Sequence, residues 1–427
     1  MDKIDSLFLE ALRAALRNTS VDWTGERKIS QEDWPALFQM ADRHHVLPMI
    51  YEAVYSCPAA ASANPAMMAS FRQHMLAKVV MQDMRTEEAL RLLSFLEGKG
   101  LHPLVVKGLV CRNIYPRPDY RISGDEDIWI CQEEFPACHK AMLEFGMEPA
   151  DSRKDPGQAD EVPYSRKGSP IYIELHKSLF PVDSRAYGDL NRFFEHAGER
   201  AIRVSARGCQ APGSAQAENS IATLGFTDHL FYLICHAFKH FLHSGFGIRQ
   251  VCDIVLFANT YGREIDWDYV LASCRAIRAQ KFAASVFRIG EKYLTFDPAA
   301  ACCMGVWSRI PVDESKMLAD LLDAGVFGDG SMSRRHSSTI TLEAVAAQKE
   351  GRRASRGLVK TVFPSARDLE GRFPYLKDRP WLLPAAWTQR ISQYRRETKK
   401  AANNSAAEAV EIGNKRVELL REYGIID

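Results

Sequence analysis

The spacing of hydrophobic residues changes along the chain. Residues 1–97 have the spacing of amphipathic helices, and the stretch from Met67 to Leu96 contains neither proline nor glycine. Gly98 and Gly100 then end the helical pattern. The pattern therefore predicts a helical N-terminal region over residues 1–97.

Short apolar runs replace the helical pattern after Gly100. The runs LHPLVVK, DIWIC and IYIELH begin at residues 101, 127 and 171, and they are rich in β-branched and aromatic residues. A helical stretch, EEFPACHKAMLEFG, separates the last two runs. Strands and a helix in this order predict a small mixed β-sheet in a core of residues 98–210, which makes the chain as a whole α+β.

Helical spacing returns in the second half of the chain. The run HLFYLICHAFKHFLH is followed by further helical segments to about Leu322, which predicts a helical domain over residues 211–330. Residues 328–340 are small, polar and basic, a composition typical of a loop or linker. Four prolines between residues 362 and 387 exclude one regular helix there. We therefore expect a basic C-terminal arm, ending in a surface helix, over residues 331–427.

Composition narrows the class of protein. Hydrophobic residues make up 46% of the chain and charged residues 26%, as in ordinary soluble proteins. The net charge of +1 excludes a general attraction of the whole chain to nucleic acid or to a membrane. Residues 331–400, however, contain 16 Lys and Arg against 6 Asp and Glu. The basic runs at 352–360 and 394–400 would suit a polyanion such as tRNA, although solvated basic helices are commoner, so nucleic acid is not the favoured partner.

The cysteines and the N-terminus indicate a reduced, cytoplasmic protein without a membrane partner. The ten cysteines include no C-x-x-C pair, so neither a zinc ribbon nor a thioredoxin-like motif is predicted. The N-terminal segment has no apolar signal core. No uncharged apolar run reaches the roughly 18 residues that a membrane span needs.

Two acids stand where the second apolar run begins. Asp125 and Asp127 are two residues apart, and alternate side chains of a strand point to the same side, away from Ile128 and Ile130. Two carboxylates so close together repel each other unless a cation lies between them. Mg²⁺ favours one or two carboxylates plus substrate phosphates, and Mn²⁺ takes the same donors. The pair is a candidate metal site, and the alternative is a polar turn before a strand.

A third acid stands in the run IYIELH. Glu174 would share one face of its strand with His176, while Ile173 and Leu175 would face the core. If this strand lies beside the strand of Asp127, the three carboxylates can hold two metal ions. The alternative is an edge-strand residue that faces water.

Basic residues near these acids are candidates for binding nucleotide phosphates. A glycine lets the backbone approach a phosphate closely, and an adjacent lysine can neutralise its charge. Arginines can bind phosphate through two parallel hydrogen bonds, although a structural salt bridge explains Arg121 equally well and His176 suits a structural role equally well. The predicted nucleotide-binding residues are Lys107, Gly108, Arg112, Arg121, His176 and Lys239.

Histidines form a stripe on the predicted helix over residues 229–243. The spacing places them on one face, where they either line an active-site cleft near Lys239 and Arg249 or pack in the core. Zinc binding has less support, because no H-E-x-x-H motif or cysteine pair accompanies them. Asp253 is expected to make a structural hydrogen bond. The histidines of the stripe are His229, His236, His240 and His243.

The motifs together resemble a known family. The order K-G (107–108), Y-P-x-P-x-x-R (115–121), G-D-x-D-I-W-I (124–130) and E-L-H (174–176) resembles the bacterial uncharacterised nucleotidyltransferase family of the polymerase-β-like superfamily. The resemblance implies that Asp125 and Asp127 are metal ligands and that Glu174 is the third acid. It extends to segments at 34–50, 229–253 and 373–384. Many nucleotidyltransferases carry serine after the turn glycine, whereas this chain has Leu109.

The resemblance implies an activity. The expected enzyme is a metal-dependent transferase that moves a nucleoside monophosphate from a nucleoside triphosphate, in the first instance ATP, to an acceptor, with release of pyrophosphate. Mg²⁺ or Mn²⁺ would be the cofactor. The acceptor stays open among a peptide or protein, a small metabolite and an RNA end. Two alternatives are a binding or scaffold protein without turnover, which Leu109 favours, and a kinase-like phosphotransferase that uses the same metal site.

Overall fold

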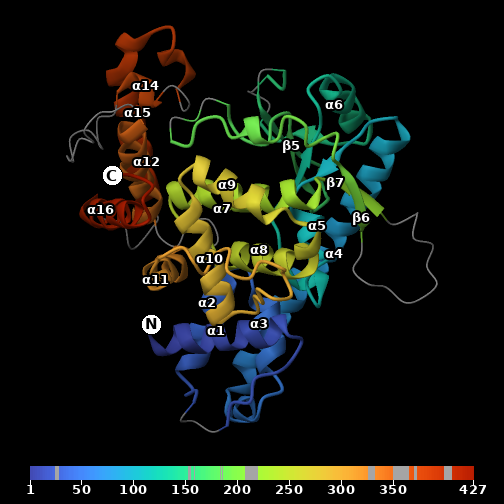
Figure 1. Cartoon of the computed structure of the whole chain (residues 1–427), viewed down its shortest axis with the longest axis vertical. Helices are drawn as coiled ribbons and strands as arrows, with labels where there is room; N and C mark the ends of the chain where they lie inside the picture. The colour runs from blue at the N-terminus through green and yellow to red at the C-terminus, as the bar shows by residue number, and fades with distance from the viewer. Residues whose placement is uncertain are drawn as a thin grey trace. The chain divides into compact units, whose positions relative to one another are not determined.

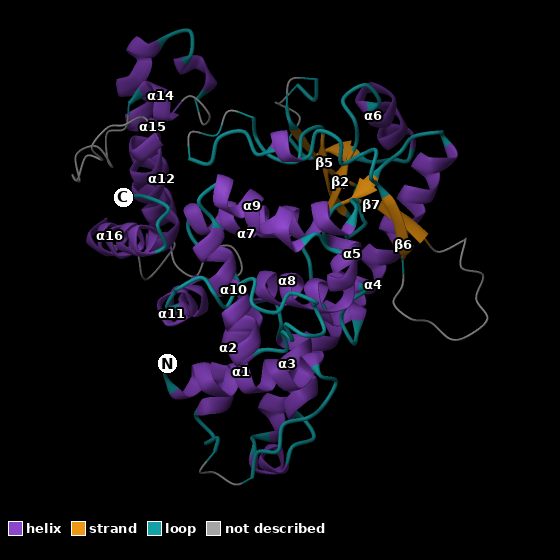
Figure 2. Cartoon of the chain, in the orientation of Figure 1, coloured by secondary structure: helices purple, strands orange, loops and turns teal. Residues whose placement is uncertain are grey.

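The chain is a mixed α+β protein, with helices at both ends and one seven-stranded sheet (Figures 1 and 2). The computed structural model describes residues 1–24, 28–151, 155–157, 159–182, 184, 186–206, 220–325, 332–349, 365–369, 373–398 and 406–427. The α+β prediction is confirmed. None of the described helices is long and apolar enough to cross a membrane.

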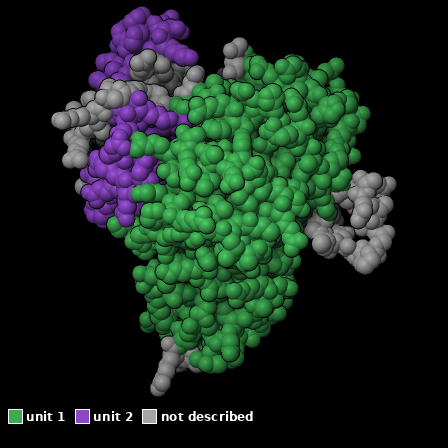
Figure 3. Space-filling view, in the orientation of Figure 1, with its two compact units in different colours: residues 1–184, 188–237, 248–319 green, residues 185–187, 238–247, 320–427 purple. Residues whose placement is uncertain are grey.

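The chain divides into two compact units, which are coloured separately in Figure 3. Unit 1 contains residues 1–184, 188–237 and 248–319, and unit 2 contains residues 185–187, 238–247 and 320–427. Unit 1 therefore combines the whole predicted N-terminal region with most of the β-sheet core and most of the helical domain, which the sequence suggests as separate regions. The four regional boundaries remain predictions.

Four helices form the N-terminal part of unit 1. They are α1 (Lys3–Leu16), α2 (Asp33–Arg43), α3 (Leu47–Val54) and α4 (Pro65–Gly98). Asp2 and Asp5 form a capping box that fixes the start of α1. Asn64 caps α4, and Pro65 follows at the first helical position, where its missing N–H leaves no hydrogen bond unmade. These local signals agree with the predicted helical region.

The sheet of unit 1 brings the acidic strands together at its centre. Its strands are β1 (Leu104–Val105), β2 (Glu126–Trp129), β3 (Glu148–Pro149), β4 (Glu161–Ser165), β5 (Tyr172–His176), β6 (Ile202–Ser205) and β7 (Ser220–Thr223). The strand order is β3-β4-β5-β2-β1-β7-β6. Strands β2 and β5 are parallel neighbours, whereas β1 is antiparallel to β2 and β4 is antiparallel to β5.

Further helices of unit 1 come after β1 along the chain (Figure 1). They are the short α5 (Gly108–Arg112), α6 (Phe135–Glu144), α7 (Phe226–Leu242), α8 (Ile248–Tyr261), α9 (Trp267–Ala276) and α10 (Gln280–Tyr293). Helix α7 continues from unit 1 into unit 2 after Ala237. Every residue of α8 from Ile248 to Ala258 is buried, so α8 runs through the core of unit 1.

Unit 2 is helical. Its helices are the end of α11 (Glu314–Ala324), α12 (Met332–Lys349), α14 (Ala366–Leu369), α15 (Leu383–Thr398) and α16 (Ala406–Glu422). The partly buried carboxylate of Asp320 accepts hydrogen bonds from Arg334 and Arg416, which ties three of these helices together. The basic run 352–360 lies outside the described residues, as do the last two residues of the run 394–400.

The loop predicted over residues 328–340 is wrong from Met332 onward, because α12 begins there, and residues 328–331 lie outside the described residues. Ser337 is buried and donates a hydrogen bond to the carbonyl oxygen of Arg334 within the helix. Helix α12 packs on α16, where a Cβ atom at Gly413 would come within 2.6 Å of the Ile340 side chain. The small polar residues that indicated a loop therefore permit close helix packing.

Candidate metal and nucleotide site

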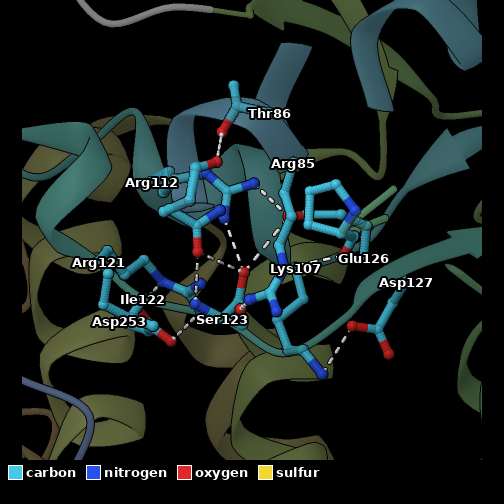
Figure 4. A network of polar contacts seen from close by, with 12 residues as sticks. Arg85, Thr86, Lys107, Arg112, Arg121, Ile122, Ser123, Glu126, Asp127 and Asp253 are labelled. Carbon is cyan, nitrogen blue, oxygen red and sulfur yellow. Dashed lines mark hydrogen bonds and ion pairs between the residues drawn. The ribbon is translucent and has the colours of Figure 1, made fainter. Parts of the chain in front are cut away.

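Asp127 lies at the centre of the sheet and is the best-enclosed acid of the predicted site. Its carboxylate is buried, with 2% of the side chain exposed. One oxygen, Oδ2, lies 2.6 Å from the Lys107 ammonium (Figure 4), and the other, Oδ1, lies 3.2 Å from His176 Nε2. Burial alone would raise the pKa of Asp127, but Lys107 and His176 hold that pKa well below its ordinary value. Asp127 is therefore a carboxylate, with a cation already beside it.

Glu174 lies directly beside Asp127. The two residues are backbone partners in the parallel pair of β2 and β5, so their side chains leave the same face of the sheet. Burial, together with the negative charges of Asp127 and Asp125, raises the pKa of Glu174 to about 7. The hypothesis of a three-acid site required these two strands to be neighbours, and β2 and β5 are neighbours.

His176 links the acids of three strands. Its Nε2 atom lies 3.2 Å from Asp127 and 4.0 Å from Glu174, and its Nδ1 atom lies 3.7 Å from Glu161 on β4. Asp127, Glu174 and His176 each offer one ligand atom, and these atoms lie within 4.8 Å of one another. Two carboxylates and one imidazole fit a divalent cation, and the negative charges of Asp127 and Asp125 add to burial in raising the pKa of Glu174.

Asp125 stands at the edge of this cluster. It precedes β2 and is half-buried, and among the described residues it is outside the group whose ligand atoms converge within 4.8 Å. Its charge nevertheless contributes to the raised pKa values of both Lys107 and Glu174, which places it in the same electrostatic environment. Asp125 as a metal ligand remains a prediction.

Lys107 and Gly108 connect β1 to α5 beside the acids. Burial would lower the pKa of Lys107, but the carboxylates of Asp127 and Asp125 raise it above the ordinary value, so the side chain is a fixed ammonium. Gly108 has a packing role, because a Cβ atom there would lie 1.7 Å from Oε2 of Glu126. The sequence assigned this glycine to phosphate binding, whereas the contact with Glu126 already explains why a larger residue is excluded.

The two predicted phosphate-binding arginines are buried and paired within the protein (Figure 4). Arg112 binds Glu126 and donates a hydrogen bond to Ser123 Oγ at 2.7 Å. Arg121 makes two hydrogen bonds of 2.7 Å with the carboxylate of Asp253. Both guanidinium groups are therefore buried in ion pairs within the protein, and their binding of nucleotide stays a prediction.

Sequence reasoning missed the network that supports the strand of Asp127. Glu126 precedes Asp127 and points to the opposite face, where Arg112 binds it. Gln82 of α4 accepts a hydrogen bond from the backbone N–H of Ser123 at 2.7 Å. Nothing in the sequence indicates that a glutamine in a long helix is buried. Glu126 could have been noticed, because it stands between the predicted ligands Asp125 and Asp127, but no role was predicted for it.

The histidine stripe divides between different roles. His229 is buried, its pKa is lowered by burial to about 4, and it lies 3.0 Å from the hydroxyl of Thr223. His236, two turns later, reaches the acid site, with Nε2 3.5 Å from Lys107 Nζ. Lys239 belongs to unit 2, and its contact with nucleotide remains a prediction.

The comparisons with known proteins identify a family. Residues 30–295 match a family described as "Uncharacterised nucleotidyltransferase". No curated protein and no solved structure matches the chain significantly. Because the family match covers more than half of the chain, including the whole acid site, the protein belongs to this uncharacterised nucleotidyltransferase family.

Proposed function

For a member of this family, we propose metal-dependent nucleotidyl transfer at the face formed by Asp127, Glu174 and His176. A nucleoside monophosphate would pass from a triphosphate, with ATP as the first candidate, to an acceptor, and pyrophosphate would leave. The observation that carries the proposal is the direct pairing of Asp127 with Glu174 in adjacent parallel strands, next to a single compensating lysine. The order of the motifs further supports a place in the polymerase-β-like superfamily.

The residues present suit a divalent cation. Asp127 and Glu174 would hold Mg²⁺ or Mn²⁺, with Asp125 or His176 completing the protein donors. When bound, the ion would supply positive charge to the triphosphate and to the oxygen that attacks it. His176, fixed by Asp127 and Glu161, would keep Glu174 from turning away from the sheet face.

Lys107 has a second role in this proposal. Its ammonium is buried beside Asp127 at the end of β1, so it can neutralise a phosphate without leaving its place. Arg112 and Arg121 are engaged elsewhere, which makes Lys107 the principal phosphate-facing cation of the predicted set in unit 1. Catalysis would then rest on positioning and electrostatics, with no covalent intermediate on the enzyme.

Leu109 is the residue that favours the scaffold alternative. A leucine side chain has no hydroxyl group that could bind phosphate, and the Leu109 side chain is buried in the core, with 1% exposed. The acceptor is not identified by these observations. A peptide or protein, a small metabolite and an RNA end are the classes to be tested.

The test combines nucleotide binding with product analysis. The full chain is titrated with each of the four ribonucleoside triphosphates, with Mg²⁺, with Mn²⁺ and with chelator, while the melting temperature is followed. We expect stabilisation only with a divalent cation, and we expect it to be lost in Asp127→Asn but kept in the control Glu148→Gln on the exposed edge strand. Absence of any shift in the native chain would overturn the proposal.

Product analysis with candidate acceptors separates the alternatives. Pyrophosphate release is the result expected for nucleotidyl transfer, whereas release of nucleoside diphosphate would indicate a kinase-like phosphotransferase. Nucleotide binding that is never accompanied by either product would favour the scaffold alternative.

A further inference from the structure

Helix α7 contributes a side chain to the acid site from 129 residues further along the chain. His236 is half-buried, and its Nε2 atom lies 3.5 Å from the Lys107 ammonium. The ring of Tyr232, one helical turn earlier and fully buried, lies 6.0 Å from the imidazole between ring centroids. The imidazole therefore stands against a fixed aromatic ring, beside the cation of the site.

Among the described residues, two side chains lie within hydrogen-bonding distance of the Lys107 ammonium. Its side chain is 9% exposed, and it lies between Asp127 Oδ2 at 2.6 Å and His236 Nε2 at 3.5 Å. An ammonium that is buried without hydrogen-bond acceptors is strongly destabilising. Any divalent cation that binds Asp127 competes with Lys107 for the same carboxylate.

We propose that His236 is a positioning residue that keeps the Lys107 ammonium at the acid site when a metal–nucleotide complex takes over Asp127. In the neutral tautomer with its proton on Nδ1, the Nε2 atom of His236 accepts a hydrogen bond from Lys107 Nζ. Lys107 then stays beside the phosphates and does not turn away from the carboxylates. This inference rests on the proposed function, because it concerns the same site in its nucleotide-bound state.

The reach of the side chain at position 236 tests this role. Glutamine places an amide oxygen near the position of Nε2, whereas asparagine ends near Nδ1 and leucine offers no acceptor. The affinity of the full chain for Mn²⁺ with α,β-methylene ATP is measured by calorimetry for His236→Gln, His236→Asn and His236→Leu. His139→Gln is the matched control, because His139 is likewise half-buried, and its Nδ1 atom lies 2.6 Å from the hydroxyl of Tyr164, away from the acids around Asp127.

We expect about a tenfold loss of affinity in the asparagine and leucine variants, the size expected for one hydrogen bond to a charged group. His236→Gln and His139→Gln should stay within about twofold of the native chain. Lys107→Met should lose affinity as well, and adding His236→Leu to it should cause no further loss, because the two residues act through one interaction.

Two results would overturn the inference. Native affinity in both His236→Asn and His236→Leu would show that the imidazole does not hold Lys107. A full additional loss in the Lys107→Met background would show that His236 acts independently of Lys107. If the native chain itself binds no metal–nucleotide complex, the proposed function fails together with this inference, whereas native binding with unaffected variants removes the inference alone.

Discussion

Two buried charged regions lie on opposite faces of β2, and they differ in their balance of charge. On one face, Glu126 pairs with Arg112, in a network adjoined by the pair of Arg121 and Asp253 (Figure 4). On the other face, one lysine compensates the acids around Asp127, and the pKa of Glu174 rises to about 7. Glu126 and Asp253 each have an arginine partner, and the buried Arg249 adds a further positive charge near them, whereas the carboxylates around Asp127 outnumber the lysine beside them. That difference is the reason why we propose the acid face as the binding site.

The largest expected effect is the loss of an ion pair in the arginine region. Asp253→Asn leaves the fully buried guanidinium of Arg121 without its charge partner, and such a loss lowers the free energy of unfolding by about 3–5 kcal/mol. Urea denaturation measures this change. Glu97→Gln is the control, because its pair with Arg203 is largely exposed and contributes about 1 kcal/mol or less. Equal effects of the two variants would contradict the account of the arginine region.

The next largest effect is the removal of the Glu174 charge from the group of acids around Asp127. The pKa of Glu174 is about 7 in the folded chain and near 4.5 ordinarily, so its protonated form stabilises the fold below pH 4.5, and this stability is lost as pH rises towards 7. Glu174→Gln keeps the neutral form at all pH values. Without metal, it should raise the free energy of unfolding at pH 8 by up to about 3 kcal/mol, with a much smaller gain at pH 4.5.

Denaturation of native and variant chains at both pH values checks this sign. A gain that does not depend on pH would show that the carboxylate of Glu174 is not under electrostatic strain. Glu148→Gln, on the edge strand β3, controls for removal of a charge from the same sheet.

A smaller effect concerns the contact between the two regions. Gly108→Ala places a methyl group 1.7 Å from the carboxylate of Glu126, which is held by Arg112 and has little room to move. Overpacking of this kind costs about 1–3 kcal/mol of stability. Gly98→Ala is the control, because a Cβ atom there meets nothing within 4 Å. Equal stability of the two variants would remove the packing role of Gly108.

The sequence predicted the acid face better than the arginine face. Alternation along two short strands was enough to place Glu174 on the same side as Asp127, because strand side chains alternate and the strands are neighbours. The partners of the arginines were not predictable in this way. Asp253 lies 132 residues from Arg121, and nothing local in the sequence distinguishes a buried arginine from a phosphate-binding one.

Helix packing also limited prediction. Residues 332–340 were expected to form a loop because of their small polar side chains, yet Ser333 and Ser337 are buried residues of α12, a helix that packs on α16. His236 was visible within the histidine stripe, but its contact with Lys107 joins residues that are 129 positions apart in the sequence. In both cases, tertiary contacts decided what local composition left open.

Binding of Mn²⁺, followed by electron paramagnetic resonance in the presence of α,β-methylene ATP, tests the central claim most directly. The account predicts saturable binding by the native chain, loss of that binding in Asp127→Asn, weakened binding in Glu174→Gln, and native binding in Glu148→Gln. Native Mn²⁺ affinity in both Asp127→Asn and Glu174→Gln would contradict the assignment of this sheet face as the metal and nucleotide site.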